Sequence, residues 1–268
     1  MLKKIAFIGV GNMARAIIDG IQGSDLDVNS IVLYDKFYEQ YSLLNEGRSE
    51  YIYASNIKEA IEISDCIVLA VKPQNFPEVL SEISSVPQCA GKMYITIAAG
   101  ITSEYISREL HGAPVVRVLP NLPITIRQGV TVICNNDAIE PDAFGFVKSI
   151  FETTGSVILI DESQMNAMIS VTSSSPAYVF KFIESICNGA EAQGLSYDNI
   201  TDIVCDVFIG SALLLKQTCA TPSELISKVS SKGGTTQRAI ESMTNDNISE
   251  IIEKAMVACT KRADELGS

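Results

Sequence analysis

Basic residues are scarce in this chain of 268 residues. It has 20 lysines and arginines against 32 aspartates and glutamates, which gives a formal net charge of −12. A surface with this charge repels both a nucleic-acid backbone and an anionic membrane. The composition therefore predicts that neither nucleic acid nor a membrane is a partner.

Long apolar runs are also missing. The most apolar stretches, residues 5–10 and 66–71, fall far short of the roughly 18 residues that a membrane-spanning helix needs. The N-terminus runs from Met-Leu-Lys-Lys directly into Ile-Ala-Phe-Ile-Gly, without the small-residue cleavage site of a signal peptide. We therefore expect a cytoplasmic protein.

Metal-binding patterns are absent from the sequence as well. Seven cysteines lie 14 to 53 residues apart with no C-x-x-C pair, and His111 is the only histidine. A tetrahedral zinc site needs such ligands at close spacing, so we predict no metal. We interpret the cysteines as small buried hydrophobic residues in a reducing compartment.

The hydrophobic periodicity changes once along the chain. Up to residue 160, short β-branched runs alternate with helix-length amphipathic segments, which is typical of a parallel sheet flanked by helices. From residue 161 onward, apolar residues recur at helical spacing. We predict an α/β protein with an N-terminal doubly wound (Rossmann-type) dinucleotide-binding domain over residues 1–160. An all-α domain for substrate binding and dimerisation should follow over residues 161–268.

The expected elements can be stated by residue number. The strands are expected at residues 4–9, 30–34, 66–71, 93–97, 115–119, 129–134 and 156–160, and helices at 141–152, 177–193, 198–217, 222–229 and 248–266. The segment 200–215 is apolar over more of its circumference than a lone surface helix should expose. We therefore expect its burial in a helix bundle or a subunit interface.

A glycine-rich turn follows the first expected strand. Residues 9–14 read Gly-Val-Gly-Asn-Met-Ala, a G-x-G-x-x-A pattern that opens a helix. Gly9 permits a tight turn, Gly11 lets the backbone approach a pyrophosphate, and Ala14 lets the helix pack on the strand. The alternative is a merely tight strand-to-helix turn, but the position after the first strand favours a dinucleotide site. The residues assigned to it are Ile8, Gly9, Gly11, Asn12 and Met13.

The second expected strand ends at Asp35. An acidic side chain at this point accepts hydrogen bonds from the adenosine ribose of NADH. Lys36 follows directly and would neutralise the 2′-phosphate of NADPH. Both NADPH and NADH therefore stay open as the cofactor, and a solvated strand end is the alternative interpretation of this pair.

Five short motifs occur along the chain. They are Asn-Met-Ala at 12–14, Leu-Ala-Val-Lys-Pro-Gln at 69–74, Pro-Asn-Leu-Pro at 120–123, Ser-Ser-Pro-Ala-Tyr at 174–178 and Ser-Lys-Gly-Gly-Thr-Thr at 231–236. In type and order they resemble the motifs of the pyrroline-5-carboxylate reductase family, and they span almost the whole chain. The departures lie near the expected substrate: Ser173 and Ser175 stand where the family usually has glycine, Lys232 replaces a proline, and Gln-Arg-Ala at 237–239 replaces Ala-Gly-Leu.

The resemblance implies an activity. It implies reduction of 1-pyrroline-5-carboxylate to L-proline by hydride transfer from NAD(P)H, in proline biosynthesis, by a homodimer or a ring of dimers. One alternative is a reductase of a related cyclic imine, and another is a non-catalytic nucleotide-binding regulator of the same fold. A β-hydroxyacid dehydrogenase is disfavoured because Val179 and Phe182 occupy the spacings at which its S-x-x-x-K-x-x-N motif requires lysine and asparagine after Ser175.

The resemblance also implies further cofactor residues. The segment 71–73 leaves the carboxyl end of a strand, where open α/β sheets bind ligands, and Pro73 keeps Lys72 out of helical geometry. We expect Lys72 near the nicotinamide ribose or the phosphates, with a surface lysine as the alternative. The further cofactor residues are Asn56, Ala70, Val71, Lys72, Pro73, Ala98 and Ala99.

Two segments of the second domain are implied as the substrate site. The serines at 173–175 read as a helix start, with Ser175 as the N-cap and Pro176 in the first turn, and capping alone is their alternative role. The glycines and threonines at 233–236 suit a small carboxylate, whereas an ordinary loop between helices would also contain glycine. The implied substrate residues are Ser174, Ser175, Ser231, Gly233, Gly234, Thr235 and Thr236, with Thr236 as the catalytic contact.

His111 is not expected to act as a general acid. It stands where a helix ends at glycine, at the opposite end of the next strand from the ligand-binding edge. A charged imidazole there would instead favour the helix dipole.

Overall fold

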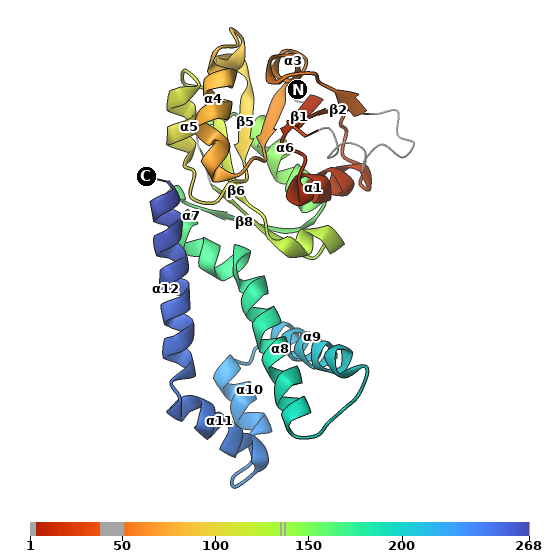
Figure 1. Cartoon of the computed structure of the whole chain (residues 1–268), viewed down its shortest axis with the longest axis vertical. Coiled ribbons are helices and arrows are strands. Elements are labelled where there is room, and N and C mark those ends of the chain that lie inside the picture. The colour runs from red at the N-terminus through yellow and green to blue at the C-terminus, as the bar shows by residue number, and fades with distance from the viewer. Residues whose placement is uncertain (1–3, 38–50, 135, 137, 268) are drawn as a thin grey trace. The chain divides into compact units, whose positions relative to one another are not determined.

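The computed structural model describes residues 4–37, 51–134, 136 and 138–267. It divides into two compact units (Figure 1): one runs to Ser174 and takes in the C-terminal residues from Ala258, and the other is Ser175–Val257. The boundary between the compact units therefore lies after Ser174, later in the chain than the change of periodicity at residue 160. The C-terminal segment from Ala258 belongs to the first unit. The expected assignment of functions to residues 1–160 and 161–268 stays a prediction.

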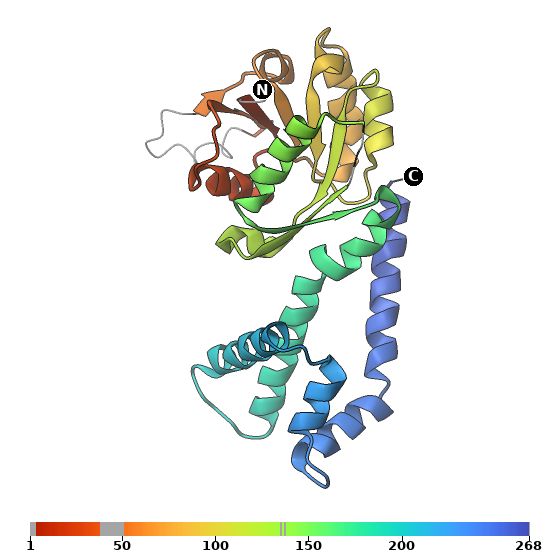
Figure 2. The same cartoon turned by 180° about the vertical axis from the view of Figure 1, so that it is seen from behind.

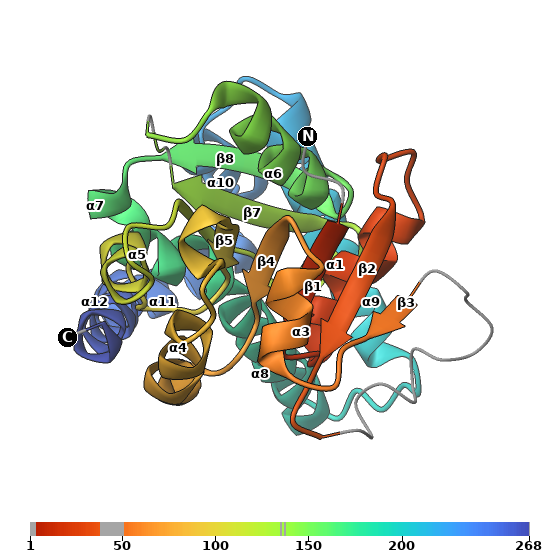
Figure 3. The same cartoon turned by 90° about the horizontal axis from the view of Figure 1, so that it is seen from above.

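A twisted sheet forms the centre of the first unit. Among the described residues eight strands lie in the order β3-β2-β1-β4-β5-β6-β7-β8 (Figure 3). All neighbours from β3 to β6 pair in parallel, β7 is antiparallel to β6, and β8 is parallel to β7. The strands are β1 Lys4–Ile8, β2 Ser30–Tyr34, β3 Tyr51–Tyr53, β4 Cys66–Leu69, β5 Met93–Thr96, β6 Val115–Leu119, β7 Gly129–Cys134 and β8 Gly155–Ile160.

Helices cover both faces of this sheet, as the predicted doubly wound fold requires. Alternate strand residues point to opposite faces. Ile5 and Phe7 therefore join a core cluster with α1 (Asn12–Gln22) and α6 (Pro141–Glu152), which Figure 2 shows in front of the sheet. Ala6 and Ile8 join the opposite cluster, under α3 Ile57–Glu62, α4 Phe76–Ser84 and α5 Ser103–Glu109 (Figure 1). Short 3-10 turns occur at Pro73–Asn75 (η1), Cys89–Gly91 (η2) and Leu122–Ile126 (η3).

The second unit is helical, as predicted. It contains α8 Ser175–Ala192, α9 Ile200–Gln217, α10 Pro222–Val229, α11 Thr235–Asn245 and the first half of α12 Ile248–Leu266. The sequence pattern gave the bounds of α10 and α12 as they are observed. At the start of α10, Thr221 and Glu224 form a reciprocal capping box. No helix among the described residues is long and apolar enough to cross a bilayer.

Two local predictions need correction. The strand β3 was not expected; at three residues it is too short to show a period, and it forms by pairing with β2. Ser175 was predicted to be an N-cap, but it is the first residue of α8, and α7 Glu162–Met168 and a π-helical turn at Ile169–Ser173 come before it. In this turn the Ser174 N–H donates to the Ile169 carbonyl over 2.9 Å, five residues back. Ser174 is helical (φ −92°, ψ −26°), so α8 begins at Ser175 without an extended N-cap residue before it.

Candidate active site

The predicted cofactor residues follow strands that end at one edge of the sheet. β1, β2, β3, β4 and β5 run parallel, so the segments that leave their carboxyl ends lie along the same edge. Chain order reverses at β1, which lies between β2 and β4 (Figure 3). Such a switch point opens the crevice in which doubly wound sheets bind nucleotides. The residues that leave these strands are Gly9 to Met13 after β1, Asp35 after β2, Asn56 after β3, Ala70 to Pro73 after β4, and Ala98 and Ala99 after β5.

The glycine-rich turn has one glycine that the fold requires and one that it does not. Gly9 has a φ of +91°, and a Cβ there would lie 2.8 Å from the Ala70 carbonyl oxygen. A Cβ on Gly11 would meet no atom within 4 Å. Gly11 caps α1 without a side-chain hydrogen bond, and no acidic residue stands in the first turn of that helix. The first N–H groups of α1 are therefore arranged to receive an anionic group, such as a pyrophosphate, beside Gly11.

Asp35 braces this turn. Its Oδ2 accepts a hydrogen bond from the Val10 backbone N–H over 2.7 Å, and its Oδ1 accepts one from Phe37 over 3.0 Å. Lys36 pairs with Glu78 at 3.3 Å on the surface, with both side chains more than 70% exposed. The structure thus gives Asp35 a second role, in holding the turn, that the sequence did not suggest.

The segment after β4 is anchored by its backbone. The Ala70 N–H donates to the Ile8 carbonyl over 2.9 Å, which holds this segment beside the glycine-rich turn. Lys72 is extended (φ −67°, ψ 148°) and its side chain is exposed, and among the described residues it forms no ion pair. The predicted exclusion of Lys72 from helical geometry is therefore confirmed, while its contact with a cofactor stays a prediction.

Asn56 is occupied by helix capping. Its Oδ1 accepts the Glu59 N–H over 2.8 Å, and its Nδ2 donates to the Ser55 hydroxyl over 3.3 Å. It therefore starts α3 at the carboxyl end of the edge strand β3. The predicted role on the adenosine side stays open.

The segment after β5 is small and closely packed. Ala98 is buried and Ala99 half-buried, and the Ala98 N–H donates to the Thr96 hydroxyl over 3.3 Å. Gly100 has a φ of +82°, and a Cβ there would lie 2.6 Å from the Ala263 carbonyl oxygen. The last turns of α12 thus pack directly on this segment, within the first unit.

The serines before α8 are tied to other parts of the first unit. The Ser174 hydroxyl lies 3.2 Å from the Cys259 sulfur on α12, and the Ser173 hydroxyl donates to the Pro120 carbonyl over 3.4 Å. Asn121, within the motif at 120–123, was not predicted to matter by itself. It is 7% exposed, donates to the Thr172 carbonyl (3.2 Å) and accepts the Val130 N–H (2.9 Å). It thereby joins the end of β6, the start of β7 and the π-helical turn.

The loop at 231–236 turns directly into α11. The Gly234 N–H donates to the Ser231 carbonyl over 2.9 Å, and a Cβ on Gly234 would overlap the Ser231 hydroxyl. Gly234 caps α11 without a side-chain hydrogen bond, and no acidic residue stands in the first turn. Thr235 and Thr236 are the first two residues of this helix, Thr235 exposed and Thr236 half-buried. Five of the predicted substrate residues, from Ser231 to Thr236, are therefore neighbours at the positive end of a helix.

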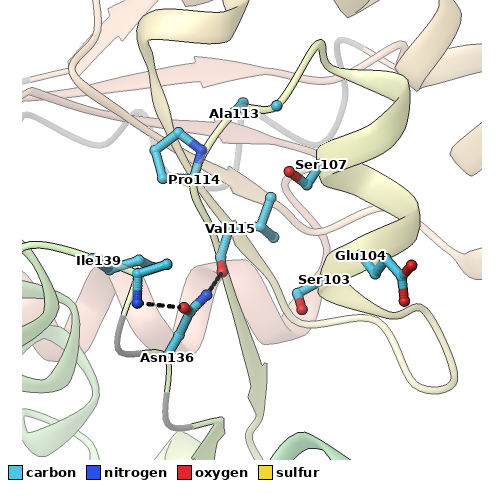
Figure 4. Close-up of a pocket in the computed structure, with 10 residues that line it drawn as sticks. Ser103, Glu104, Ser107, Ala113, Pro114, Val115, Asn136 and Ile139 are labelled. Atoms are coloured by element: carbon cyan, nitrogen blue, oxygen red, sulfur yellow. Dashed lines mark hydrogen bonds between the residues drawn. The ribbon is translucent and has the colours of Figure 1, made fainter.

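Two further features lie away from these segments. A cavity of about 290 Å³ opens between α5 and the residues around Asn136 and Ile139 (Figure 4), at the N-terminal end of β6. None of the predicted site residues lines it. His111 also precedes β6, with its Nε2 3.3 Å from the Ser84 carbonyl oxygen, as expected for a residue remote from the ligand-binding edge.

A cluster of charged and polar side chains around the buried Arg117 connects the sheet to the C-terminal segment. Arg117 on β6 is 1% exposed, and its Nη1 lies 3.6 Å from Glu162 Oε1. Asn166 accepts from Arg117 and donates to Asp264 over 2.7 Å. Burial raises the pKa of the nearby Cys134 thiol to about 12, and the charge of Glu162 adds to this shift. A thiol with a raised pKa keeps its proton at neutral pH, and only the thiolate form of cysteine is a strong nucleophile.

Comparison with known proteins matches both parts of the chain. Residues 162–266 match the family model described as pyrroline-5-carboxylate reductase dimerisation, and residues 4–100 match that of NADP oxidoreductase coenzyme F420-dependent. The chain is 31% identical over 268 residues to the pyrroline-5-carboxylate reductase of Escherichia coli (strain K12), covering 99% of each chain.

Solved structures agree in fold over the whole chain. The pyrroline-5-carboxylate reductase of Coxiella burnetii matches with a TM-score of 0.87 and 29% identity, covering all of both chains. The pyrroline carboxylate reductase of Plasmodium falciparum, solved with NADP bound, matches with a TM-score of 0.88 and 25% identity, covering 100% of this chain and 98% of that one.

Proposed function

This chain belongs to the pyrroline-5-carboxylate reductase family, and from that membership we propose that it reduces 1-pyrroline-5-carboxylate to L-proline with NADPH or NADH. The observation that carries the proposal is that the relatedness spans both units, so it includes the nucleotide-binding edge and the loop at 231–236 together. The activity belongs to proline biosynthesis, and we propose that it takes place in the cytoplasm.

The residues at the sheet edge fit a dinucleotide. The space beside Gly11 and the uncapped start of α1 suit the pyrophosphate, and Asp35 suits the adenosine ribose. We propose Ile8, Asn12 and Met13 with the segments after β3, β4 and β5 as the remaining contacts. When bound, the nicotinamide supplies the hydride, which is chemistry that no side chain provides.

The loop at 231–236 fits the carboxylate of the imine. The amides of Thr235 and Thr236 stand in the first turn of α11, where they have no partner within the helix. The helix dipole adds a favourable interaction with a negative charge. We propose that these amides, the Thr235 hydroxyl and Ser231 hold the carboxylate, and that Ser174 and Ser175 contribute to the substrate site.

Thr236 is proposed as the catalytic contact. A protonated iminium accepts hydride far more readily than a neutral imine, and the half-buried Thr236 hydroxyl would hold the ring nitrogen and its proton. His111 lies at the wrong end of β6 to donate that proton. We therefore assign the proton to solvent and no side chain as a general acid. The protein's contribution is to orient the imine carbon within about 3 to 3.5 Å of the hydride donor and to exclude water.

The protein forms a homo-oligomer through its helical part, since residues 162–266 match a dimerisation family. We propose a homodimer or a ring of dimers built on α9. Val207, Ile209 and Leu214 on that helix are 61%, 58% and 51% exposed in the single chain. Exposed apolar patches of this kind are typical of protein–protein interfaces. The net charge of −12 supports the further proposal that nucleic acid and membranes are not partners.

One assay tests the reaction. The purified protein is mixed with NADPH or NADH and each of several cyclic imines that differ in ring size and in the presence of a carboxylate, and nicotinamide oxidation is followed by absorbance. We expect turnover with 1-pyrroline-5-carboxylate and L-proline as the product. Steady turnover of another imine alone would favour the related-imine reductase, which the departures at Ser175 and Lys232 keep in consideration. Cofactor binding without turnover of any imine would favour the non-catalytic regulator.

A further inference from the structure

Gln237 departs from the family pattern, and its side chain bonds to the substrate loop. It is the third residue of α11, and its Oε1 accepts a hydrogen bond from the Gly233 backbone N–H over 2.6 Å. Its Nε2 donates to Glu241 Oε1 over 2.8 Å. One amide side chain thus connects the glycine turn to the next turn of the helix.

The neighbours of Gln237 determine which way its amide points. A carboxylate only accepts hydrogen bonds, so Glu241 must face the NH₂ group of Gln237, and the amide oxygen is left for Gly233. Arg238 holds Glu241 from the other side, with Nη1 3.0 Å from Oε2. Arg238 and Gln237 both depart from the family pattern, in which glycine and alanine stand at these positions. Through Glu241, Arg238 therefore supports the orientation of Gln237.

This contact differs from an ordinary helix cap. A glutamine at the third helical position usually accepts the N–H of the cap residue. Here the N–H of the cap residue, Gly234, is bonded to the Ser231 carbonyl, and Gln237 binds Gly233, one residue earlier. Gly233 has a φ of +76°, in the left-handed region. Glycine adopts positive and negative φ about equally readily, so its own backbone preference does not hold it in this conformation. Both glycine amides are consequently engaged inside the loop.

We propose that Gln237 is a positioning residue for the substrate carboxylate. It holds Gly233 in its left-handed conformation and withdraws that N–H from the substrate, so that the amides of Thr235 and Thr236 present the carboxylate site. The substrate then binds a loop that is already ordered, and it does not have to supply the free energy of ordering. This inference rests on the proposed function, since it takes the loop as the carboxylate site.

Replacing Gln237 by methionine tests the proposal. Methionine has a similar length but forms neither hydrogen bond. In Gln237→Met we expect faster hydrogen exchange at the Gly233 amide and a KM for 1-pyrroline-5-carboxylate raised by about three- to tenfold, the range for one lost hydrogen bond. The KM for NADPH and kcat should change by less than about twofold, because neither depends on carboxylate binding. Glu241→Gln is the matched control, since its amide oxygen still accepts from Gln237, and we expect a smaller change in both measurements.

A reciprocal exchange separates this role from general stability. In Gln237→Glu the two carboxylates at 237 and 241 repel each other, and the loop contact should weaken. In the double variant Gln237→Glu, Glu241→Gln, the glutamate accepts from both Gly233 and the new glutamine, so the exchange protection of Gly233 should return. If Gln237→Glu loses the exchange protection of the Gly233 amide and the double variant does not restore it, the proposed contact is wrong.

The outcomes also separate this inference from the proposed function. If the wild-type protein reduces the imine and Gln237→Met has unchanged exchange and unchanged KM, the positioning role is wrong. If the wild-type protein oxidises no cofactor with this imine, the proposed function is wrong, and the exchange measurement still decides whether Gln237 orders the loop.

Discussion

The two compact units differ in how much of their apolar surface they bury themselves. In the first unit, Ile5 to Ile8 on β1 are at most 1% exposed, because helices cover both faces of the sheet. In residues 175–257, all of which the structure describes, the buried hydrophobic residues are Ala190 and Val204. Burial of apolar surface is the dominant favourable term in folding. The first unit can therefore supply its own core, whereas the helical unit needs apolar surface from another copy.

The two units also carry different parts of the predicted site. The predicted cofactor residues lie mainly on turns that a completed sheet fixes, while the loop at 231–236 belongs to the unit with almost no core of its own. Assembly should consequently matter more for substrate binding than for cofactor binding. The following changes test this contrast.

The largest effect is expected from a charge on the apolar side of α9. Val207→Asp places a carboxylate where we expect a partner subunit, and burying an unpaired charge costs several kcal/mol. We expect monomers or aggregates by light scattering at micromolar concentration, loss of imine turnover, and NADPH binding that is largely retained. Thr201→Asp adds the same charge at the start of α9, where the helix dipole favours it, and should remain assembled. An intact oligomer of Val207→Asp would show that α9 is not at the interface.

A second pair of variants compares the two glycines of the first turn. A Cβ at Gly11 would meet no atom within 4 Å, so Gly11→Val should stay folded and bind NADPH roughly 100-fold more weakly, equal to about 2.8 kcal/mol. Gly9→Ala should instead lower the thermal midpoint, since a left-handed conformation costs a residue with a Cβ about 1–2 kcal/mol before the clash with Ala70 is added. Unchanged NADPH affinity in folded Gly11→Val would remove the phosphate site from this turn.

A third test concerns the loop in the helical unit. Thr236→Val removes the hydroxyl proposed to contact the ring nitrogen. A hydrogen bond to a charged group is worth about 1.5–3 kcal/mol, so kcat/KM for the imine should fall roughly 10- to 150-fold while cofactor binding is unchanged. Thr235→Val is the comparison at the neighbouring, exposed position. A loss in Thr235→Val alone would shift the catalytic contact by one residue, and full activity in both would make the loop purely structural.

The smallest expected effect is on cofactor preference. Asp35→Ser removes a charge that repels the 2′-phosphate of NADPH, and we expect the ratio of kcat/KM values to move toward NADPH by about tenfold, equal to about 1.4 kcal/mol. Asp35→Asn removes the charge but keeps an oxygen that can accept the Val10 N–H. A shift in both variants would identify the charge as the cause. A shift in Asp35→Ser alone would identify the hydrogen bond from the Val10 N–H as the cause. No shift in either would place Asp35 away from the ribose.

The accuracy of the sequence-based predictions followed the range of the interactions involved. The bounds of β2, β6, β7, α6, α10 and α12 were predicted as observed, because period, turn residues and caps are local signals. The three-residue β3 and the π-helical turn at Ile169–Ser173 were missed. The first exists through pairing with β2, and the second depends on a backbone bond that replaces the usual helical one.

The amino-acid sequence by itself determined the fold class, the family motifs and the identity of the residues at the predicted site. The tertiary structure alone decided which partners the site residues contact: Asp35 accepts the Val10 amide, Ser174 lies beside Cys259, and Gly233 donates to Gln237. The reason is physical. Periodicity and turn chemistry act over a few neighbouring residues, whereas a side chain's partner depends on which segments the sheet and the helices bring together. Even Gln237, only four residues from Gly233, finds its partner because a glycine turn and a helix start place an amide within its reach.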